Sequence, residues 1–240
     1  MSSVKIIKKK TLESHFITGS QLLKIKFPKM EISNKDFLPL ANGVLTMISG
    51  AGGVGKGFVS LQSVIRYLTE KEEATALLWY AEDAQRVLAS RLKLFNVDTS
   101  IIERMTFLSI SPRDYKGWQS KISKFDIIIL DPLVYFYEDN ENDNGEASAF
   151  MSLLNKQCVK SDNIMIVVHH HSKSGQTRGA SAFTDNARLV YQLTVSAQDG
   201  APDKAVDVNV LKDNFNVCQK EISYIVPQKM TDAETVEETF

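Results

Sequence analysis

Cysteine, long apolar runs and net charge are all scarce in this sequence, and each scarcity excludes a class of protein. The two cysteines, Cys158 and Cys218, lie far apart and lack the spacing of metal ligands, which suits a reducing compartment. No apolar run reaches the length of a transmembrane helix, and the basic segment Val4–Lys10 lacks the apolar stretch of a signal peptide. We therefore expect a cytoplasmic protein with no membrane segment.

The charges of the chain nearly cancel. Lys and Arg number 28 against 29 Asp and Glu, so the formal net charge is −1. No global field draws such a protein onto DNA, and any nucleic-acid contact must come from a local basic patch or from a ring of subunits. The chain has no internal repeat, and its 240 residues suit a single α/β domain with a large core.

Composition divides the chain into three parts. Residues 1–43 form an N-terminal leader, in which Ser20 is expected to cap a short helix that runs through Lys26. Residues 44–230 form the main domain. Residues 231–240 form a polar, acidic tail that should be disordered in isolation.

From Val44 onward, β-type and α-type segments alternate, which indicates an α/β fold with a mainly parallel, buried central sheet flanked by helices. The expected strands are 44–49, 76–81, 105–109, 125–130 and 164–169, and the expected helices are 56–68, 84–95, 117–123 and 145–160. After residue 180 the pattern changes, and segments 188–196, 206–212 and 217–226 indicate C-terminal antiparallel strands.

A glycine-rich motif between the first strand and the first helix is the most specific signal. Its residues are Gly50, Ala51, Gly52, Gly53, Val54, Gly55, Lys56 and Gly57. Backbone N–H groups of such a loop, together with the helix N-terminus, bind the phosphates of a nucleotide, and Lys56 reaches the β- and γ-phosphates from a solvent-facing position. The motif predicts nucleotide binding.

The eighth position of this motif departs from the usual pattern. Ser or Thr there supplies a hydroxyl to Mg²⁺, whereas Gly57 supplies none. Asp131, which ends the apolar strand, is the expected Mg²⁺-associated carboxylate, although an Asp can also simply close a strand before Pro132. Nucleotide binding is predicted, and the strength of hydrolysis is left open.

Two carboxylates follow the expected strand 76–81. At the C-terminal edge of a strand beside the phosphate strand, Glu82 can polarise the attacking water. Asp83 is expected to cap the helix that follows, and both residues also suit the dipole of that helix.

Polar and basic residues follow strand 164–169. His169, His170 and His171 cannot all face one metal, because neighbouring residues on a strand point to opposite faces. One of them can sense the γ-phosphate, or the three can be a plain polar strand end. Lys173 can contact nucleic-acid phosphates and Arg178 can offer positive charge to a nucleotide, or both can belong to an ordinary surface loop.

The order of these motifs resembles that of the RepA-type hexameric replicative helicases of plasmids and phages, a branch of the RecA-like ATPases related to DnaB. The resemblance extends from about Ser20 to Val226. The matching segments are Leu22-Leu23-Lys24-Ile25-Lys26-Phe27-Pro28, Ser49–Lys56, Ala81-Glu82-Asp83, Leu130-Asp131-Pro132-Leu133, Glu141-Asn142-Asp143-Asn144, His169-His170-His171-Ser172-Lys173 and Arg178–Arg188.

This resemblance implies a RecA-like P-loop NTPase that hydrolyses ATP with Mg²⁺ between the subunits of a homo-oligomeric ring, a hexamer, and binds single-stranded DNA. Glu82 would be the catalytic base and His170 the sensor. Arg178 would be an arginine finger that acts on the neighbouring subunit's ATP, and Lys212 a second cation in trans. Gly57 and the short, weakly basic central loops depart from the family pattern.

Three functions compete at this point. The first is an ATP-driven DNA motor or helicase, which the retained Glu82, Asp131 and Arg178 favour. The second is a nucleotide-binding replication or recombination accessory protein that does not unwind DNA, and the third is an ATP-binding scaffold with weak hydrolysis. Gly57 favours the last two. The acidic tail, which ends in Phe240, is either a docking segment for a replication partner or a solvated end.

Overall fold

A computed structural model describes residues 16–26, 29–137, 143–170, 181–197, 205–218 and 222–226. The chain divides into two units, residues 1–30 and residues 31–240. The second unit therefore contains residues 31–43, which the sequence analysis assigned to the leader. Within the described residues, no helix has both the length and the apolar character needed to cross a membrane.

The smaller unit contains the short helix α1 (Gly19–Leu22). Thr18 caps this helix, because its hydroxyl accepts a hydrogen bond from the backbone of Gln21 while the Gln21 side chain accepts one from the backbone N–H of Thr18. This reciprocal pair is a capping box. The expectation of a Ser20 cap and a helix through Lys26 is wrong, because Ser20 already lies inside the helix and the helix ends at Leu22.

The larger unit is built on a sheet of eight described strands, in the order β10-β9-β8-β3-β7-β6-β4-β5. Their bounds are β3 (Leu45–Gly50), β4 (Ala76–Tyr80), β5 (Met105–Leu108), β6 (Ile127–Asp131), β7 (Ile164–His170), β8 (Leu189–Val195), β9 (Ala205–Asp213) and β10 (Ile222–Ile225). The neighbouring strands β8, β3, β7, β6, β4 and β5 run parallel to one another. β9 and β10 continue the sheet, each antiparallel to its neighbour. The predicted fold class is confirmed.

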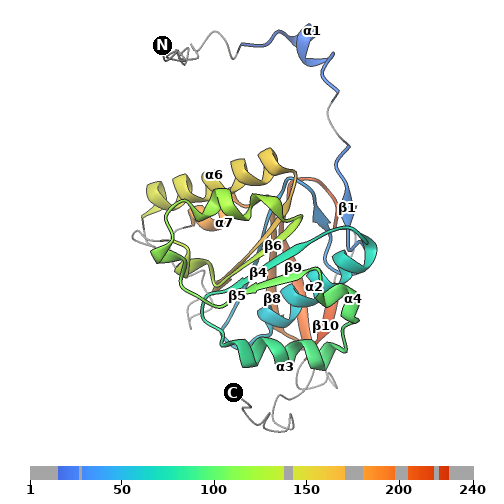
Figure 1. Cartoon of the computed structure of the whole chain (residues 1–240). Helices are drawn as coiled ribbons and strands as arrows, with labels where there is room; N and C mark the ends of the chain where they lie inside the picture. The colour runs from blue at the N-terminus through green and yellow to red at the C-terminus, as the bar shows by residue number, and fades with distance from the viewer. Residues whose placement is uncertain are drawn as a thin grey trace, which may run out of the picture. The chain divides into compact units, whose positions relative to one another are not determined.

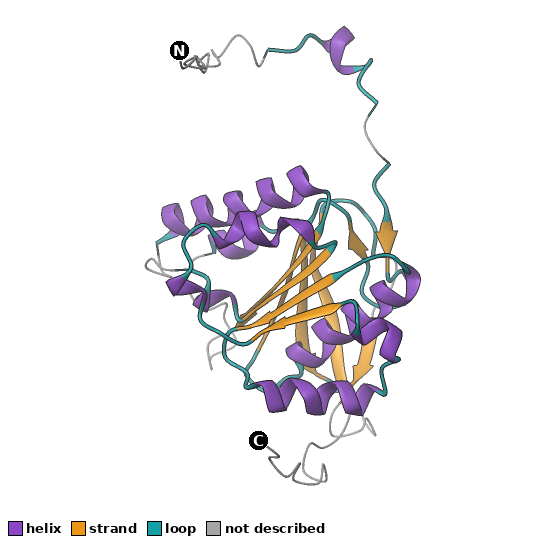
Figure 2. Ribbon diagram, viewed as in Figure 1, coloured by secondary structure: helices purple, strands orange, loops and turns teal. Residues whose placement is uncertain are grey.

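Helices cover both faces of the sheet (Figures 1 and 2). One face carries α2 (Lys56–Glu70), α3 (Gln85–Phe95) and α4 (Thr99–Ile102), and the other carries α5 (Trp118–Lys121), α6 (Asn144–Ser161) and α7 (Ala182–Asn186). Each face has its own hydrophobic core, and the central strands contribute alternate side chains to the two. The buried strands read as continuous apolar runs because both of their faces are covered.

The position of β4 differs from the sequence-based expectation. Glu82 was expected to follow a strand beside the phosphate strand β3, but β7 and β6 lie between β3 and β4. Because all four strands are parallel, their C-terminal ends still meet at one edge of the sheet. The residues that follow β3, β4, β6 and β7 therefore gather there.

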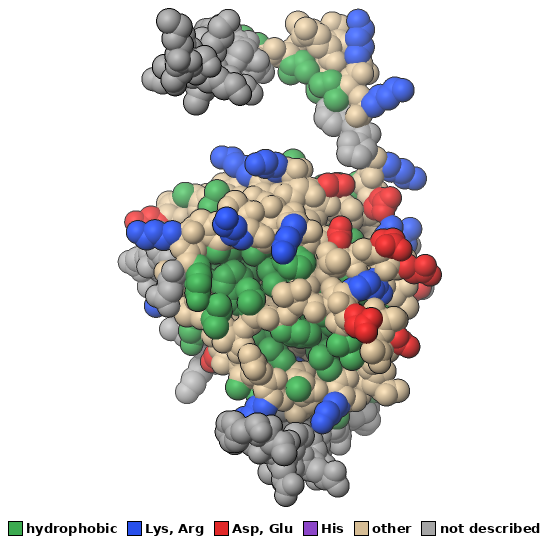
Figure 3. All heavy atoms as spheres, in the orientation of Figure 1, with side chains coloured by type: hydrophobic (Ala, Val, Ile, Leu, Met, Phe, Trp, Pro, Cys, Tyr) green, Lys and Arg blue, Asp and Glu red, His purple; other side chains and the backbone are tan. Residues whose placement is uncertain are grey.

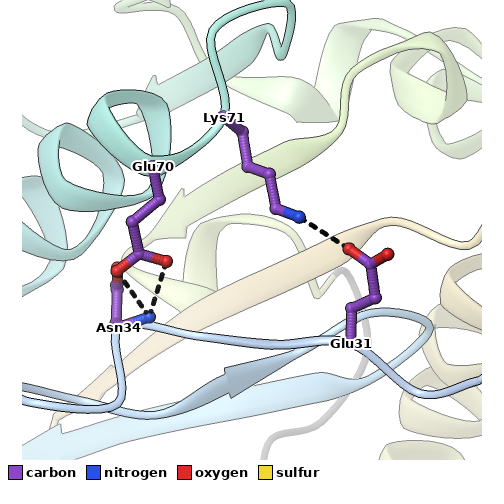
Figure 4. A network of polar contacts seen from close by, with 4 residues as sticks. All are labelled: Glu31, Asn34, Glu70 and Lys71. Atoms are coloured by element: carbon purple, nitrogen blue, oxygen red, sulfur yellow. Dashed lines mark hydrogen bonds and ion pairs between the residues drawn. The ribbon is translucent and has the colours of Figure 1, made fainter.

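The segment before β3 is fastened to the end of α2. It forms a small antiparallel sheet of β1 (Ile32–Ser33) and β2 (Leu40–Ala41). The Glu70 carboxylate accepts the backbone N–H of Asn34 at 3.0 Å, and Lys71 Nζ lies 2.6 Å from a carboxylate oxygen of Glu31 (Figure 4). The Asn34 side chain donates to the carbonyl of Ser63 at 2.8 Å inside the core. These bonds make residues 31–43 part of the main unit.

Candidate functional site

The glycine-rich loop joins β3 to α2 and begins the helix with Lys56. Gly55 is the residue that precedes the helix, with φ of 103°, in the left-handed region that only glycine adopts without strain. A side-chain carbon placed on Gly55 would lie 2.5 Å from Cγ2 of Val226. The loop thus needs glycine for both its backbone conformation and its packing, as expected of a phosphate-binding loop at a helix N-terminus.

Lys56 is buried, with only 5% of its surface exposed, so its expected solvent-facing position is wrong. It is the first residue of α2, and its Nζ donates to the carbonyl oxygens of Gly50 at 3.0 Å and Ala51 at 2.7 Å. Burial lowers the pKa of Lys56 to about 8, although the nearby carboxylates of Asp131 and Glu82 favour the charged form. The amino group is therefore held by hydrogen bonds to the carbonyl oxygens of its own loop.

The loop forms one wall of a pocket at the C-terminal edge of the parallel strands. Lys56, Glu82, Asp131 and His170 all line this pocket. They lie far apart in the sequence, and the parallel sheet brings them together. Their roles in binding and chemistry remain predictions.

Asp131 ends β6 and is buried in the pocket wall. Burial and the neighbouring Asp83 carboxylate raise the pKa of Asp131 to about 7, against the influence of Arg91 and Lys56. Mg²⁺ is commonly held by one or two carboxylates together with the phosphates of a nucleotide, so a lone buried Asp fits this use. Within the described ranges, no group of three or more His, Cys, Asp or Glu residues could hold a metal alone.

Asp83 does not cap α3 as predicted. Ala84 occupies the N-cap position, and no side chain bonds to the first turn of the helix. The Asp83 carboxylate instead pairs with Arg91, whose Nη1 lies 2.5 Å from Oδ2. This contact is a charge-assisted hydrogen bond between two oppositely charged, partly buried groups. The backbone carbonyl of Asp83 also accepts the hydroxyl of Ser109, and Glu82 remains exposed at the pocket.

The histidines separate as the strand geometry predicts. His170 lines the pocket, whereas His169 is buried and its ring lies 5.3 Å from that of Phe183. Neighbouring residues of β7 point to opposite faces of the sheet. Of the two described histidines, His170 is the one that lines the pocket, and its sensor role stays a prediction. His171 lies outside the described residues.

Of the predicted cations other than Lys56, Lys212 is the one that lies in the described part of the chain. Lys212, on β9, donates from Nζ to the backbone carbonyl of Asp185. It does not line the pocket, which leaves its predicted role in trans untested. Arg178 and Lys173 lie outside the described residues.

Arg91 is the pocket residue that sequence reasoning missed. It lies three residues after the buried Leu88 on α3, and residues so spaced share one face of a helix. A charged residue on the inward face of a helix was the available signal. Its partner Asp83 lies before the first residue of α3, so the i, i+3 and i, i+4 spacing of helical residues could not predict their ion pair.

Comparisons with known proteins place the chain in a family. Residues 32–176 match the AAA domain family AAA_25, and no curated protein matches the chain. A KaiC-like protein of Pyrococcus horikoshii has a similar structure, with a TM-score of 0.60 and 14% identity, over 77% of this chain and 85% of that one. The flagellar accessory protein FlaH of Methanocaldococcus jannaschii is similar, with a TM-score of 0.59 and 14% identity, over 76% and 85%.

These likenesses support the RecA-like P-loop part of the sequence-based resemblance and do not single out the RepA-type helicases. P-loop ATPases generally bind ATP with Mg²⁺. The family match covers more than half of the chain and includes the phosphate loop, Glu82 and Asp131. The chain therefore belongs to the AAA domain family and is a P-loop NTPase with a RecA-like fold.

Proposed function

We propose that this protein is an ATP-driven motor on single-stranded DNA, which hydrolyses ATP at the interfaces of a homo-oligomeric ring. The observation that carries the ATPase part is the shared pocket of Lys56, Glu82 and Asp131. A cation, a base and a metal-associated carboxylate at the edge of a parallel sheet are the parts that phosphoryl transfer to water requires.

Each side chain has a distinct task in this proposal. Lys56 leaves the carbonyl oxygens that now hold it and binds the β- and γ-phosphates. Glu82, the exposed carboxylate, accepts a proton from the attacking water. Asp131 would hold Mg²⁺ beside the phosphates, where the ion would neutralise charge. His170 senses the γ-phosphate from β7.

Assembly would complete the site. Arginine fingers and similar cations stabilise the charge that develops on the transferred phosphoryl group. In the described part of the chain, the cations that line the pocket are Lys56 and Arg91, and Lys212 is bound elsewhere. We infer that Arg178 and Lys212 act on the nucleotide of a neighbouring subunit.

The surface offers candidate contacts for such an assembly. Hydrophobic side chains gather in the middle of the face that Figure 3 shows, with basic side chains above them. Exposed large apolar residues of the described chain include Leu94, Ile110 and Tyr115. An exposed apolar patch is typical of an interaction surface.

The DNA part rests on the motif resemblance and on Lys173. With a net charge of −1, a single subunit has little general attraction for nucleic acid, so a ring that presents one loop per subunit suits the proposal. Binding of a replication partner through the acidic tail, with Phe240 in an apolar pocket, is part of the same proposal.

A second candidate function is a nucleotide-binding accessory or scaffold with weak hydrolysis. Gly57 supplies no hydroxyl for Mg²⁺. The Arg91 guanidinium lies next to the position that the Cβ atom of a Ser or Thr would occupy there. This arrangement favours nucleotide binding over fast turnover.

The test combines ATPase rates with and without single-stranded DNA and strand displacement on a forked duplex. A motor shows DNA-stimulated hydrolysis, loss of hydrolysis in Lys56→Ala and Glu82→Gln, and a ring mass with ATP and Mg²⁺. Binding without stimulated hydrolysis or displacement would support the accessory function instead. Hydrolysis at the parent rate in Lys56→Ala would overturn both.

A further inference from the structure

Arg91 brings into the pocket a cation that has no role in the hydrolysis proposed above. Its side chain is 13% exposed, and Nη1 lies 2.5 Å from Oδ2 of Asp83. Its Cζ lies 5.3 Å from the ring centre of Phe58 and 5.7 Å from that of Tyr80, within the range of cation–π contacts. One ion pair and two aromatic rings thus hold the guanidinium at the pocket wall.

The guanidinium fills the space that Gly57 leaves. A side-chain carbon placed on Gly57 would lie 3.0 Å from Nη1, 3.3 Å from Cζ and 3.5 Å from Nη2 of Arg91. A Ser or Thr at this position would press against the guanidinium. The two residues are therefore complementary: glycine removes the usual ligand of Mg²⁺ and makes room for a fixed cation.

The guanidinium also keeps unused hydrogen-bonding capacity. Arg has five N–H donors, and among the described residues Nη1 donates to Asp83 while the buried Nε has no partner. The planar donors of Arg match the oxygens of a phosphate group. With Glu82 and Asp131 in the same pocket, an incoming triphosphate also needs compensating positive charge.

We propose that Arg91 is a phosphate-binding residue that supplies, from within the same subunit, part of the positive charge that Mg²⁺ and its hydroxyl ligand supply in other P-loop sites. The inference rests on the nucleotide site proposed above and deepens it. Binding of a nucleoside triphosphate then depends less on Mg²⁺. The Arg91 guanidinium donates hydrogen bonds both to Asp83 and to the phosphates.

The test measures ATP affinity by calorimetry in Mg²⁺ and in EDTA. The variants are Arg91→Gln, Gly57→Ser, the double variant Gly57→Ser/Arg91→Gln, and Lys56→Ala. Arg86→Gln is the matched control, because Arg86 lies on the same helix but is exposed and does not line the pocket. Gln retains much of the aliphatic stem and loses the charged guanidinium that lies over the two rings. Melting temperatures check that each variant folds.

We expect the parent and Arg86→Gln to bind ATP in EDTA within about tenfold of their affinity in Mg²⁺. Arg91→Gln should lose roughly ten- to a hundredfold in EDTA, as expected for a lost charge-assisted bond, and less in Mg²⁺. Gly57→Ser alone should weaken binding in EDTA by displacing Arg91, and the double variant should bind mainly with Mg²⁺.

Two different failures can be told apart. Unchanged binding in EDTA for Arg91→Gln, while Lys56→Ala loses binding, would overturn the role of Arg91 and leave the nucleotide site intact. Absence of ATP binding by the parent, or undiminished binding by Lys56→Ala, would overturn the nucleotide site and with it this inference. Should Arg91→Gln fail to fold, Arg91→Met serves instead, because it keeps an unbranched side chain and loses the charge. Parent-like EDTA binding by that variant would overturn the role of Arg91.

Discussion

Gly55→Ala should destabilise the protein, and the structure separates two causes. The φ of 103° at Gly55 lies in the left-handed region, which costs a residue with a side chain about 1–2 kcal/mol. The new carbon would also lie 2.5 Å from Cγ2 of Val226, which is buried and has a stiff, β-branched side chain. Overpacking of this kind costs about 1–3 kcal/mol.

The two causes together predict a loss of about 2–5 kcal/mol in the free energy of unfolding. Urea titration without nucleotide measures it, and the midpoint of thermal unfolding should fall by roughly 4–20 °C. Gly52→Ala is the matched control from the same loop, because nothing lies within 4 Å of its added carbon and its φ is not in the left-handed region. Its effect should stay within about 0.5 kcal/mol.

A double-mutant cycle with Val226→Ala separates packing from strain. In the Val226→Ala background, Gly55→Ala should cost about 1–3 kcal/mol less, because the clash is gone while the backbone strain persists. An equal cost in both backgrounds would show that Val226 does not restrain the loop. A parent-like unfolding midpoint for Gly55→Ala itself would refute both parts of the reasoning.

Three further predictions concern the chemistry and the chain end. The lowered pKa of Lys56, about 8, predicts that ATP affinity is greatest below pH 8 and falls up to about tenfold per pH unit above it, as the amino group loses its proton. Calorimetry across pH 7–10 should show no such fall in Lys56→Arg, because the guanidinium stays protonated over this range. Arg178→Ala should lower ATP turnover with little change in ATP affinity. If Arg178 and Glu82 act across an interface, mixing this variant with excess Glu82→Gln subunits should restore turnover. A mixture as inactive as its two components would contradict an arginine finger in trans. Deletion of residues 231–240 should leave ATPase activity unchanged and weaken pull-down of a replication partner, whereas unchanged pull-down or a lower melting temperature would argue against a docking tail.

The elements near the phosphate loop could be predicted because their signals are local. The runs that became β6 and β7 are continuously apolar up to their polar ends, as is typical of strands in a sheet covered on both faces. The glycine-rich turn before a helix is a backbone requirement that the residue types themselves express. The short strands β1 and β2 carried no comparable signal, because each is two residues long. The link between them and α2 is made by Asn34, which follows β1 and bonds to Glu70.

The sequence by itself determined the class of the fold, the phosphate loop and the candidate pocket residues Lys56, Glu82 and Asp131, because a parallel sheet gathers the ends of its strands at one edge. The choice of His170 among the three histidines came from the family resemblance. Only the tertiary structure decided that two strands separate β4 from β3, that Lys56 is buried, and that Asp83 pairs with Arg91 rather than capping its helix. Strand order and long-range ion pairs depend on which surfaces meet when the helices pack, and no local pattern of residues encodes that choice.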